Sequence, residues 1–205
     1  MNMFKNFFQN TRRPKGFTGK IMVQVMNRGH ARLAKWGLSH ITLKGKIDAL
    51  DIGCGGGANL ASLLTMFPSG TAAGMDYSAV NVAQSTRLNQ AEISKGRCRV
   101  LQGNVSDLPF PKNSFDLITA FETIYFWPDL PSSFRQIHGV LRPGGAFLIC
   151  NEMSDPSDDK WTKLIEGMRV YGRPELEQLL TDAGFSRIDT DEKNGCICLI
   201  AEKKP

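Results

Sequence analysis

From Lys46 onward, short apolar runs alternate regularly with amphipathic segments, and this alternation limits the fold more than any other feature of the chain. Five of the apolar runs have the length and composition of strands, at residues 47–52, 71–76, 98–102, 116–121 and 145–150. Between them, leucine and phenylalanine recur at the spacing of a buried helical stripe. Strands that alternate with helices in this way predict a parallel sheet with helices on both faces.

Capping and turn residues add detail to this prediction. Ser78 is a suitable N-cap for a helix that runs to about Lys95, and residues 142–145 (RPGG) are expected to end a later helix. Near the end of the chain, Asn194 and Gly195 form a strong hairpin signal between two strands, so the sheet is expected to finish antiparallel. The final strand contains CICLIA, which is apolar on both alternating faces and therefore predicts a strand inside the sheet edge.

Charge is distributed unevenly along the 205 residues, which are enough for one α/β domain. The net charge is +5, yet residues 1–46 contain ten Lys or Arg and no acidic residue, and the remainder holds 15 basic against 20 acidic side chains. This basic, aromatic leader could contact nucleic acid, an anionic membrane surface or an acidic substrate, or could be a solvated lid. We favour a helical N-terminal lid over residues 1–45, followed by the main body over 46–205.

Composition also excludes several classes of protein. No uncharged apolar run approaches the length of a membrane span, and the first residues lack the apolar core of a secretory signal. We therefore expect a cytoplasmic protein without a membrane partner. The five cysteines are an odd set without a C-x-x-C pair or a histidine at ligand spacing, so we predict neither disulfides nor a metal site. The oligomeric state stays open.

The turn after the first predicted strand, in ALDIGCGGGANLASLL, contains four glycines. From Gly53 onward it fits the dinucleotide pattern G-x-G-x-x-G/A, with Ala58 in the last place. Ligands of open α/β sheets bind beyond the carboxyl ends of the strands, so this turn is expected to line a ligand site. Its glycines could meet the pyrophosphate of NAD or the amino-acid end of a cofactor that has no phosphate.

Four segments, in this order, carry a resemblance to a known family: LDIGCGGG, GMDYS, GNVSDLPFPKNSFDLITAFETIYFWPDL and LRPGGAFLI. They resemble the successive motifs of class I S-adenosylmethionine-dependent methyltransferases of the small-molecule branch, over about residues 47–200. The resemblance implies a Rossmann-like three-layer sandwich, with a mostly parallel seven-stranded sheet and an antiparallel last strand. It also implies that S-adenosylmethionine is the cofactor, S-adenosylhomocysteine its product, and a small molecule the acceptor of a methyl group transferred by in-line displacement.

The same resemblance assigns cofactor-binding positions to the ends of the first four strands. They are Asp51, Gly53, Cys54, Gly55, Asp76, Tyr77, Asn104, Val105 and Phe121. Asp51 would orient the glycine turn and the methionyl end of the cofactor, and Asp76 would accept hydrogen bonds from both ribose hydroxyls. Tyr77 would pack on the adenine. Asn104, where the family more often has Asp, would accept a hydrogen bond from the adenine amino group, and the backbone of Val105 would donate one to the ring.

The catalytic residues stay unknown from the sequence, because a base is needed only if the acceptor must lose a proton. Tyr125 is one candidate, in an aromatic run (residues 125–127) that either lines an acceptor pocket or belongs to the core. His30 is the other, either as a base in the lid or as a surface histidine. In the lid interpretation, Met22 and Trp36 would help to close the site.

Three alternatives to a small-molecule methyltransferase stay open. The segment after the fourth strand is A-F-E-T, whereas methyltransferases that act on exocyclic or amide nitrogens generally have D/N-P-P-Y/F there, and no Pro-Cys pair follows. An RNA methyltransferase that uses the basic leader is therefore a second hypothesis. The others are a non-catalytic module that binds S-adenosylmethionine and an NAD-dependent oxidoreductase. If the chain is an enzyme, residues 151–172 are expected to set its acceptor specificity.

Overall fold

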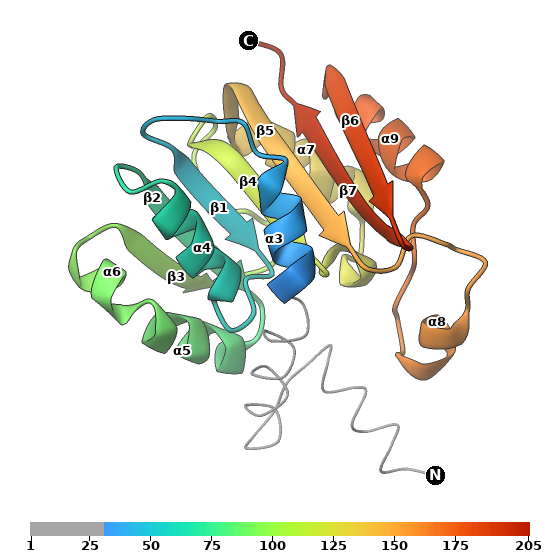
Figure 1. Cartoon of the computed structure of the whole chain (residues 1–205), viewed down its shortest axis with the longest axis horizontal. Coiled ribbons are helices and arrows are strands. Elements are labelled where there is room, and N and C mark those ends of the chain that lie inside the picture. The colour runs from blue at the N-terminus through green and yellow to red at the C-terminus, as the bar shows by residue number, and fades with distance from the viewer. Residues whose placement is uncertain (1–30) are drawn as a thin grey trace.

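The computed structural model describes residues 31–205, so Met22, His30 and most of the predicted lid lie outside the described residues. Its centre is a seven-stranded sheet of order β3-β2-β1-β4-β5-β7-β6 (Figure 1). The strands are β1 Asp48–Ile52, β2 Thr71–Asp76, β3 Cys98–Gln102, β4 Phe115–Phe121, β5 Leu141–Asn151, β6 Arg187–Lys193 and β7 Cys196–Glu202. Strands β1 to β5 are parallel, and β7 is antiparallel to both β5 and β6. The predicted parallel sheet with an antiparallel ending is confirmed.

Helices cover both faces of this sheet (Figure 1). One face carries α3 Ala31–Ser39, α4 Ala58–Met66 and α5 Ala79–Leu88, and the other carries α7 Leu130–Val140 and α9 Arg173–Asp182. Shorter helices are α6 Gln90–Ser94, the 3₁₀ turn η1 Ile124–Phe126 and α8 Lys160–Leu164. Each face has its own apolar cluster, with Leu60 and Leu63 of α4 in one and Phe134 and Ile137 of α7 in the other. The layers are therefore helix, sheet and helix, as expected.

The described part of the predicted lid packs on the sheet. Leu33 and Leu38 of α3 are buried in the same cluster as Leu148 of β5. Just after α3, His40 Nε2 lies 2.9 Å from Asp191 Oδ2 of β6. This helix therefore covers the sheet beside β5 and β7, and a lid formed by the preceding residues stays a prediction.

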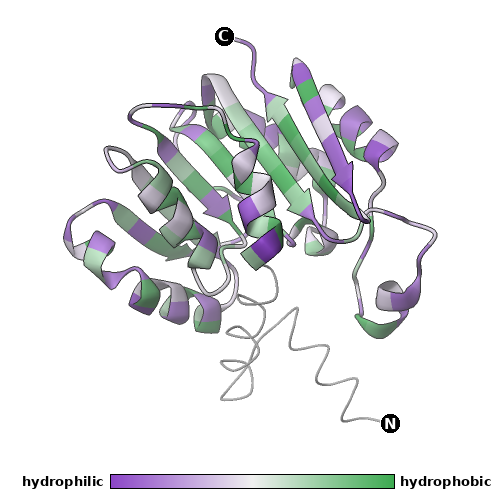
Figure 2. Cartoon of the chain, in the orientation of Figure 1, coloured by the Kyte–Doolittle hydropathy of each residue, from purple (hydrophilic) through white to green (hydrophobic). Residues whose placement is uncertain are grey.

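Strand β7 lies inside the sheet and is covered on both faces, as its sequence predicts. Ile197 and Leu199 belong to the apolar cluster on the α7 side, whereas Cys198 belongs to the cluster on the α3 side. Figure 2 shows apolar residues concentrated on the central strands, while the edge strand β6 is largely hydrophilic. Burial on both faces explains why β7 lacks the alternation of a half-exposed strand.

Two boundaries differ from the sequence prediction by more than one residue. The helix expected from Ser78 to Lys95 is divided at Asn89, whose buried side-chain amide donates to the carbonyls of Gly57 and Ser85 and ends α5. Strand β5 begins at Leu141, four residues earlier than predicted, because Leu141 pairs with Phe115 of β4 across a local register shift. Both differences depend on partners distant in sequence. The N-cap at Ser78 is confirmed, since its Oγ accepts from the Asn81 N–H.

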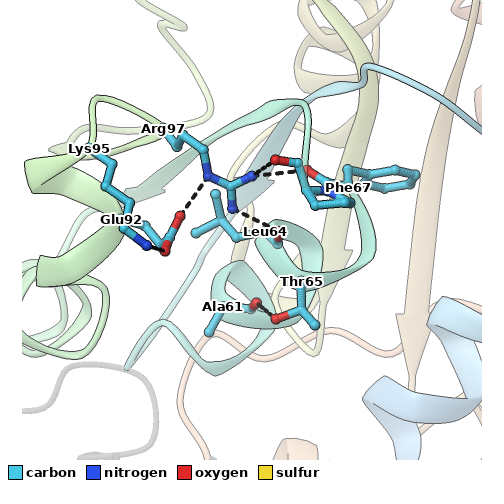
Figure 3. A network of polar contacts seen from close by, with 8 residues as sticks. Ala61, Leu64, Thr65, Phe67, Glu92, Lys95 and Arg97 are labelled. Atoms are coloured by element: carbon cyan, nitrogen blue, oxygen red, sulfur yellow. Dashed lines mark hydrogen bonds and ion pairs between the residues drawn. The ribbon is translucent and has the colours of Figure 1, made fainter.

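The end of α4 is held by the side chain of Arg97, just before β3 (Figure 3). The Arg97 guanidinium donates to the carbonyls of Leu64 (2.9 Å), Phe67 (3.4 Å) and Pro68, and its Nε donates to Glu92 Oε2 at 2.6 Å. Carbonyls at a helix C-terminus have no intrahelical partner, and a cation there also interacts favourably with the helix dipole. Arg97 therefore fixes the helix that follows the glycine turn.

Candidate active site

A cavity of about 300 Å³ lies at the carboxyl ends of β1, β2 and β3. The residues that line it are Ile52, Gly53, Met75, Asp76, Tyr77, Gly103, Asn104, Val105, Thr123, Phe126, Trp127 and Pro128. Five of the nine predicted cofactor positions are among them, and they come from three different strand ends. The cavity is therefore where parallel α/β sheets bind ligands.

The glycine turn is shaped by a close approach to the segment after β4. Gly53 has a φ of +75°, and its N–H donates to the carbonyl of Met75 at 2.7 Å. A Cβ at Gly53 would lie 2.2 Å from Thr123 Oγ1. Any other residue at this position would thus adopt an unfavourable positive φ, and its side chain would clash with Thr123. The glycine allows β1 and β4 to form neighbouring walls of the cavity.

Asp76, at the end of β2, is held by three donors of the protein. Its Oδ1 accepts from the Ser78 N–H at 2.9 Å and from Asn81 Nδ2 at 3.0 Å, and its Oδ2 accepts from the Gly55 N–H at 2.9 Å. Burial raises the pKa of Asp76, while these hydrogen bonds oppose the shift. A carboxylate offers about four acceptor positions, so about one stays available, on Oδ2. Acceptance from both ribose hydroxyls would require a protein donor to give way.

Asp51, at the end of β1, is fully buried below the glycine turn. Its Oδ1 accepts from Thr119 Oγ1 of β4 at 2.7 Å, whereas its Oδ2 has no hydrogen-bond partner among the described residues. Burial, with a smaller contribution from the neighbouring charge of Asp76, raises the pKa of Asp51 to about 7, while the Thr119 bond opposes the rise. An unpartnered buried acceptor is costly, so it suggests a missing donor or cation.

The predicted adenine contacts line one wall of the cavity. Tyr77 is exposed, and Val105 is buried with its side chain in the apolar core. Asn104 Oδ1 accepts from the Ser106 N–H at 3.1 Å, a local turn that uses one of its two lone pairs. One acceptor position on Asn104 therefore remains, and its contact with adenine stays a prediction.

Five of the predicted residues that the structure describes lie outside the cavity lining: Asp51 and Gly55, placed above, and Cys54, Phe121 and Tyr125. Phe121 is buried on the α3 side, where a Cβ at Gly37 would lie 2.8 Å from its ring. The Cys54 side chain is buried beside Ser85. Tyr125 is also buried, and its hydroxyl accepts from the Met153 N–H at 2.9 Å. Burial raises the pKa of Tyr125 well above its usual value, which disfavours a phenolate base near neutral pH.

The aromatic run after β4 is divided between two environments. Phe126 and Trp127 line the cavity, and the Trp127 Nε1 donates to Thr123 Oγ1 at 3.2 Å. Phe126 also packs against a third apolar cluster, formed by Tyr125, Ile165, Met168 and Val170. The sequence left open whether residues 125–127 line a pocket or belong to the core. Phe126 and Trp127 face the cavity, whereas Tyr125 packs in the core. Ile165, Met168 and Val170 of the segment 151–172 therefore pack behind Phe126.

Glu122 was not among the predicted site residues, although it directly follows β4. It has a φ of +57°, which is uncommon for a residue other than glycine. Its Oε1 accepts from the Tyr125 hydroxyl at 3.2 Å and from the Glu152 N–H. Burial, with a smaller contribution from the Glu152 charge, raises the pKa of Glu122 to about 8, while the hydrogen bonds from the Glu152 N–H and the Tyr125 hydroxyl oppose the rise. Only its position after a strand could have identified it.

Sequence reasoning also missed Met75, Gly103 and Thr123 in the cavity wall. Gly103 had a local signal, since a glycine after a strand often marks a close approach, and a Cβ there would lie 2.8 Å from Met75 Sδ. Thr123 had none, because its position opposite Gly53 depends on how β1 and β4 pair. Among residues 31–205, no group of three or more His, Cys, Asp or Glu could hold a metal ion, and no helix is long and apolar enough to cross a membrane.

Comparison with known proteins identifies similar chains. Residues 50–149 match the family described as a methyltransferase domain. Nocamycin O-methyltransferase of Saccharothrix syringae is 34% identical over 116 residues, which are 56% of this chain and 41% of that protein. Demethylmenaquinone methyltransferase of Geobacillus sp. (strain WCH70) is 29% identical over 174 residues, 71% of this chain and 73% of the relative.

Similarity among solved structures extends over most of the chain. One chain from the complex between the Haloferax volcanii Trm112 methyltransferase activator and a methyltransferase has a TM-score of 0.79 and 20% identity, and the match covers 91% of this chain and 94% of that one. At this identity the likeness shows the fold alone. The chain spans less than half of the Saccharothrix relative and about three quarters of the Geobacillus one.

Proposed function

The chain belongs to the class I S-adenosylmethionine-dependent methyltransferases, and from this premise we propose that it transfers a methyl group from that cofactor to a small-molecule acceptor. The observation that carries the proposal is the cavity at the carboxyl ends of β1, β2 and β3, with Asp76 in its wall and Asp51 below it. The two relatives named above support a small acceptor, since their names give nocamycin and demethylmenaquinone.

The residues around the cavity fit this cofactor. The buried Oδ2 of Asp51 has no partner in the described part of the chain, and the donor's amino-acid end carries an ammonium group that could supply one. Asp76 keeps about one acceptor position for a ribose hydroxyl, and Tyr77 has an exposed ring for the adenine. Gly53 brings backbone rather than a side chain to the cavity wall. When bound, the cofactor supplies an activated methyl group on a sulfonium.

The protein's own contribution to such a reaction is to position the acceptor and to exclude water. Phe126, Trp127 and Pro128 form an apolar wall of the cavity. Their faces would also attract a cationic group at about 0.5 to 2 kcal/mol each for the aromatic rings. We therefore expect an acceptor with an apolar or aromatic part that packs against this wall, with residues 151–172 behind it setting the shape.

A nucleic-acid acceptor is the second candidate, and the basic leader is the observation that favours it. The leader lies largely outside the described residues. The twelve residues that line the cavity within residues 31–205 include no Lys, Arg or His, the side chains that contact phosphates. We therefore expect that the protein does not methylate labelled RNA. If the full chain does methylate RNA, and loses this activity when residues 1–30 are removed, the result would favour a nucleic-acid acceptor instead.

Titration calorimetry tests the proposal directly. We expect heat of binding with S-adenosylmethionine and S-adenosylhomocysteine and none with NADH. Binding of NADH without either adenosyl ligand would instead favour an oxidoreductase. A screen of apolar small molecules with a labelled methyl donor then separates an enzyme from a non-catalytic module, because only an enzyme transfers the label.

A further inference from the structure

The Thr123 hydroxyl lies at the β4 side of the cavity with one hydrogen-bonding position filled. Thr123 lines the cavity, and its Oγ1 accepts from the indole Nε1 of Trp127 at 3.2 Å. A threonine hydroxyl can also donate one hydrogen bond, and none of residues 31–205 accepts one from Thr123. Its hydrogen is therefore available to a ligand in the cavity.

Trp127 fixes the direction in which this hydroxyl can donate. The Trp127 side chain is only 8% exposed, and its ring packs edge-to-face on Phe134 of α7, with the ring centroids 6.3 Å apart. The indole N–H occupies a lone pair of Thr123 Oγ1, so the hydroxyl hydrogen points away from the indole. A hydroxyl that accepts one hydrogen bond also becomes a stronger donor, because the bonds in a chain polarise one another.

The glycine turn leaves this hydroxyl uncovered on the side of β1. Oγ1 of Thr123 lies so close to Gly53 that a Cβ at that position would be 2.2 Å away. Both residues line the cavity. Because Gly53 has no side chain, it does not separate Thr123 from a ligand that lies over the turn.

The backbone of the glycine turn offers few donors of its own. The N–H groups of Gly53 and Cys54 both donate to the carbonyl of Met75, at 2.7 and 3.1 Å. The Gly55 N–H donates to Asp76 Oδ2 at 2.9 Å. Three consecutive N–H groups are thus used inside the protein, so an anionic group bound beside them depends on a donor from elsewhere.

The contacts proposed for the methyl donor follow the order of the strands. Asn104 after β3 would meet the adenine, Asp76 at the end of β2 the ribose, and Asp51 at the end of β1 the ammonium group. The next strand in the sheet is β4, which Thr123 follows (Figure 1). The amino-acid end of the donor is therefore the part nearest Thr123, and its carboxylate is the group there that accepts hydrogen bonds.

We propose that Thr123 binds the carboxylate of S-adenosylmethionine through its hydroxyl, which Trp127 orients. The inference rests on the proposed function, because it assumes that this donor occupies the cavity. A hydrogen bond from a hydroxyl to a carboxylate is charge-assisted and about twice as strong as a neutral one. Thr123 thus holds the end of the donor opposite the adenine, and the sulfur lies between these two contacts.

Calorimetry with S-adenosylmethionine and its decarboxylated form tests this inference, because the two ligands differ only by the carboxylate. Thr123→Val keeps the shape of threonine but removes the hydroxyl. In this variant, affinity for S-adenosylmethionine should fall about 10- to 100-fold, and affinity for the decarboxylated ligand should change little. Thr123→Ser keeps the hydroxyl and should restore most of the affinity.

The decarboxylated ligand separates recognition of the carboxylate from a structural role. Valine also removes the acceptor of the Trp127 N–H, and a change in the cavity wall acts on both ligands. An equal loss for both ligands, or no loss for either, would overturn the inference. If wild type binds neither ligand, the proposed function fails as well.

Two further variants complete the experiment. The matched control is Thr71→Val, since the Thr71 hydroxyl donates to Asp48 Oδ1 at 2.7 Å at the opposite end of β2. It should leave both affinities unchanged. If Thr123→Val does not fold, Thr123→Ala is measured in the same way with the same expected result, because it removes the hydroxyl without adding a methyl group against Gly53.

Discussion

Glu122 should make the folded protein less stable at alkaline pH, even without a ligand. Burial raises the pKa of Glu122 from 4.5 to about 8, so between these values the folded chain holds a proton that the unfolded chain has lost. Stability must then fall as pH rises through this interval, and it levels off above pH 8. At about 1.4 kcal/mol for each pH unit, the loss from pH 5 to pH 9 is about 4 kcal/mol.

The comparison of wild type with Glu122→Gln isolates this contribution. Glutamine keeps an oxygen that can accept from the Tyr125 hydroxyl and the Glu152 N–H but cannot ionise. Urea unfolding without cofactor at pH 5, 7 and 9 should show the variant gaining about 4 kcal/mol over wild type across this range. Titration of other groups, including Asp51, is common to both proteins and cancels. Parallel stability curves for the two proteins would refute the reasoning that the folded protein holds Glu122 in its neutral form.

Three further substitutions test the site and its support. Asp76→Ala should weaken binding of S-adenosylmethionine by about 1.5 to 3 kcal/mol, the range for a hydrogen bond to a charged group, and unchanged affinity in calorimetry would remove Asp76 from the ribose role. Gly53→Ala places a Cβ 2.2 Å from Thr123 Oγ1 at a positive φ, so it should lower the unfolding free energy by about 1 to 3 kcal/mol; a melting temperature equal to wild type would contradict this. Arg97→Ala removes the donors from three carbonyls at the end of α4 and just after it, and should cost about 1 to 3 kcal/mol in urea unfolding; Arg97→Lys should recover only part, because lysine lacks the planar fork. Full recovery by lysine would show that charge alone holds this helix end.

The sheet was predictable from local patterns. Strand periodicity located the five parallel strands, and Asn194 with Gly195 located the hairpin, because these signals depend on residues close in sequence. The break at Asn89 and the early start of β5 were not predictable. Asn89 ends a helix through the carbonyl of Gly57, and Leu141 joins the sheet through Phe115, both far away along the chain.

The site was predictable only in part. The glycine turn indicated Gly53, and the family resemblance indicated Asp76 and Tyr77; all three line the cavity. The aromatic run 125–127 did not indicate which of its rings faces the cavity, because a 3₁₀ turn and the packing of residues 165–170 decide that orientation. The expected roles of these residues toward a ligand stay predictions.

The sequence by itself determined the succession of strands and helices along the chain, the position of the glycine turn and the family resemblance, because periodicity, turn residues and motifs are local properties. Tertiary structure alone decided which side chains meet. It set Thr123 against Gly53, turned Tyr125 away from the cavity, and left the carboxyl groups of Asp51 and Glu122 without a cation partner among the described residues. Burial and pairing of a charge depend on every element packed around it, and those elements come from distant parts of the chain.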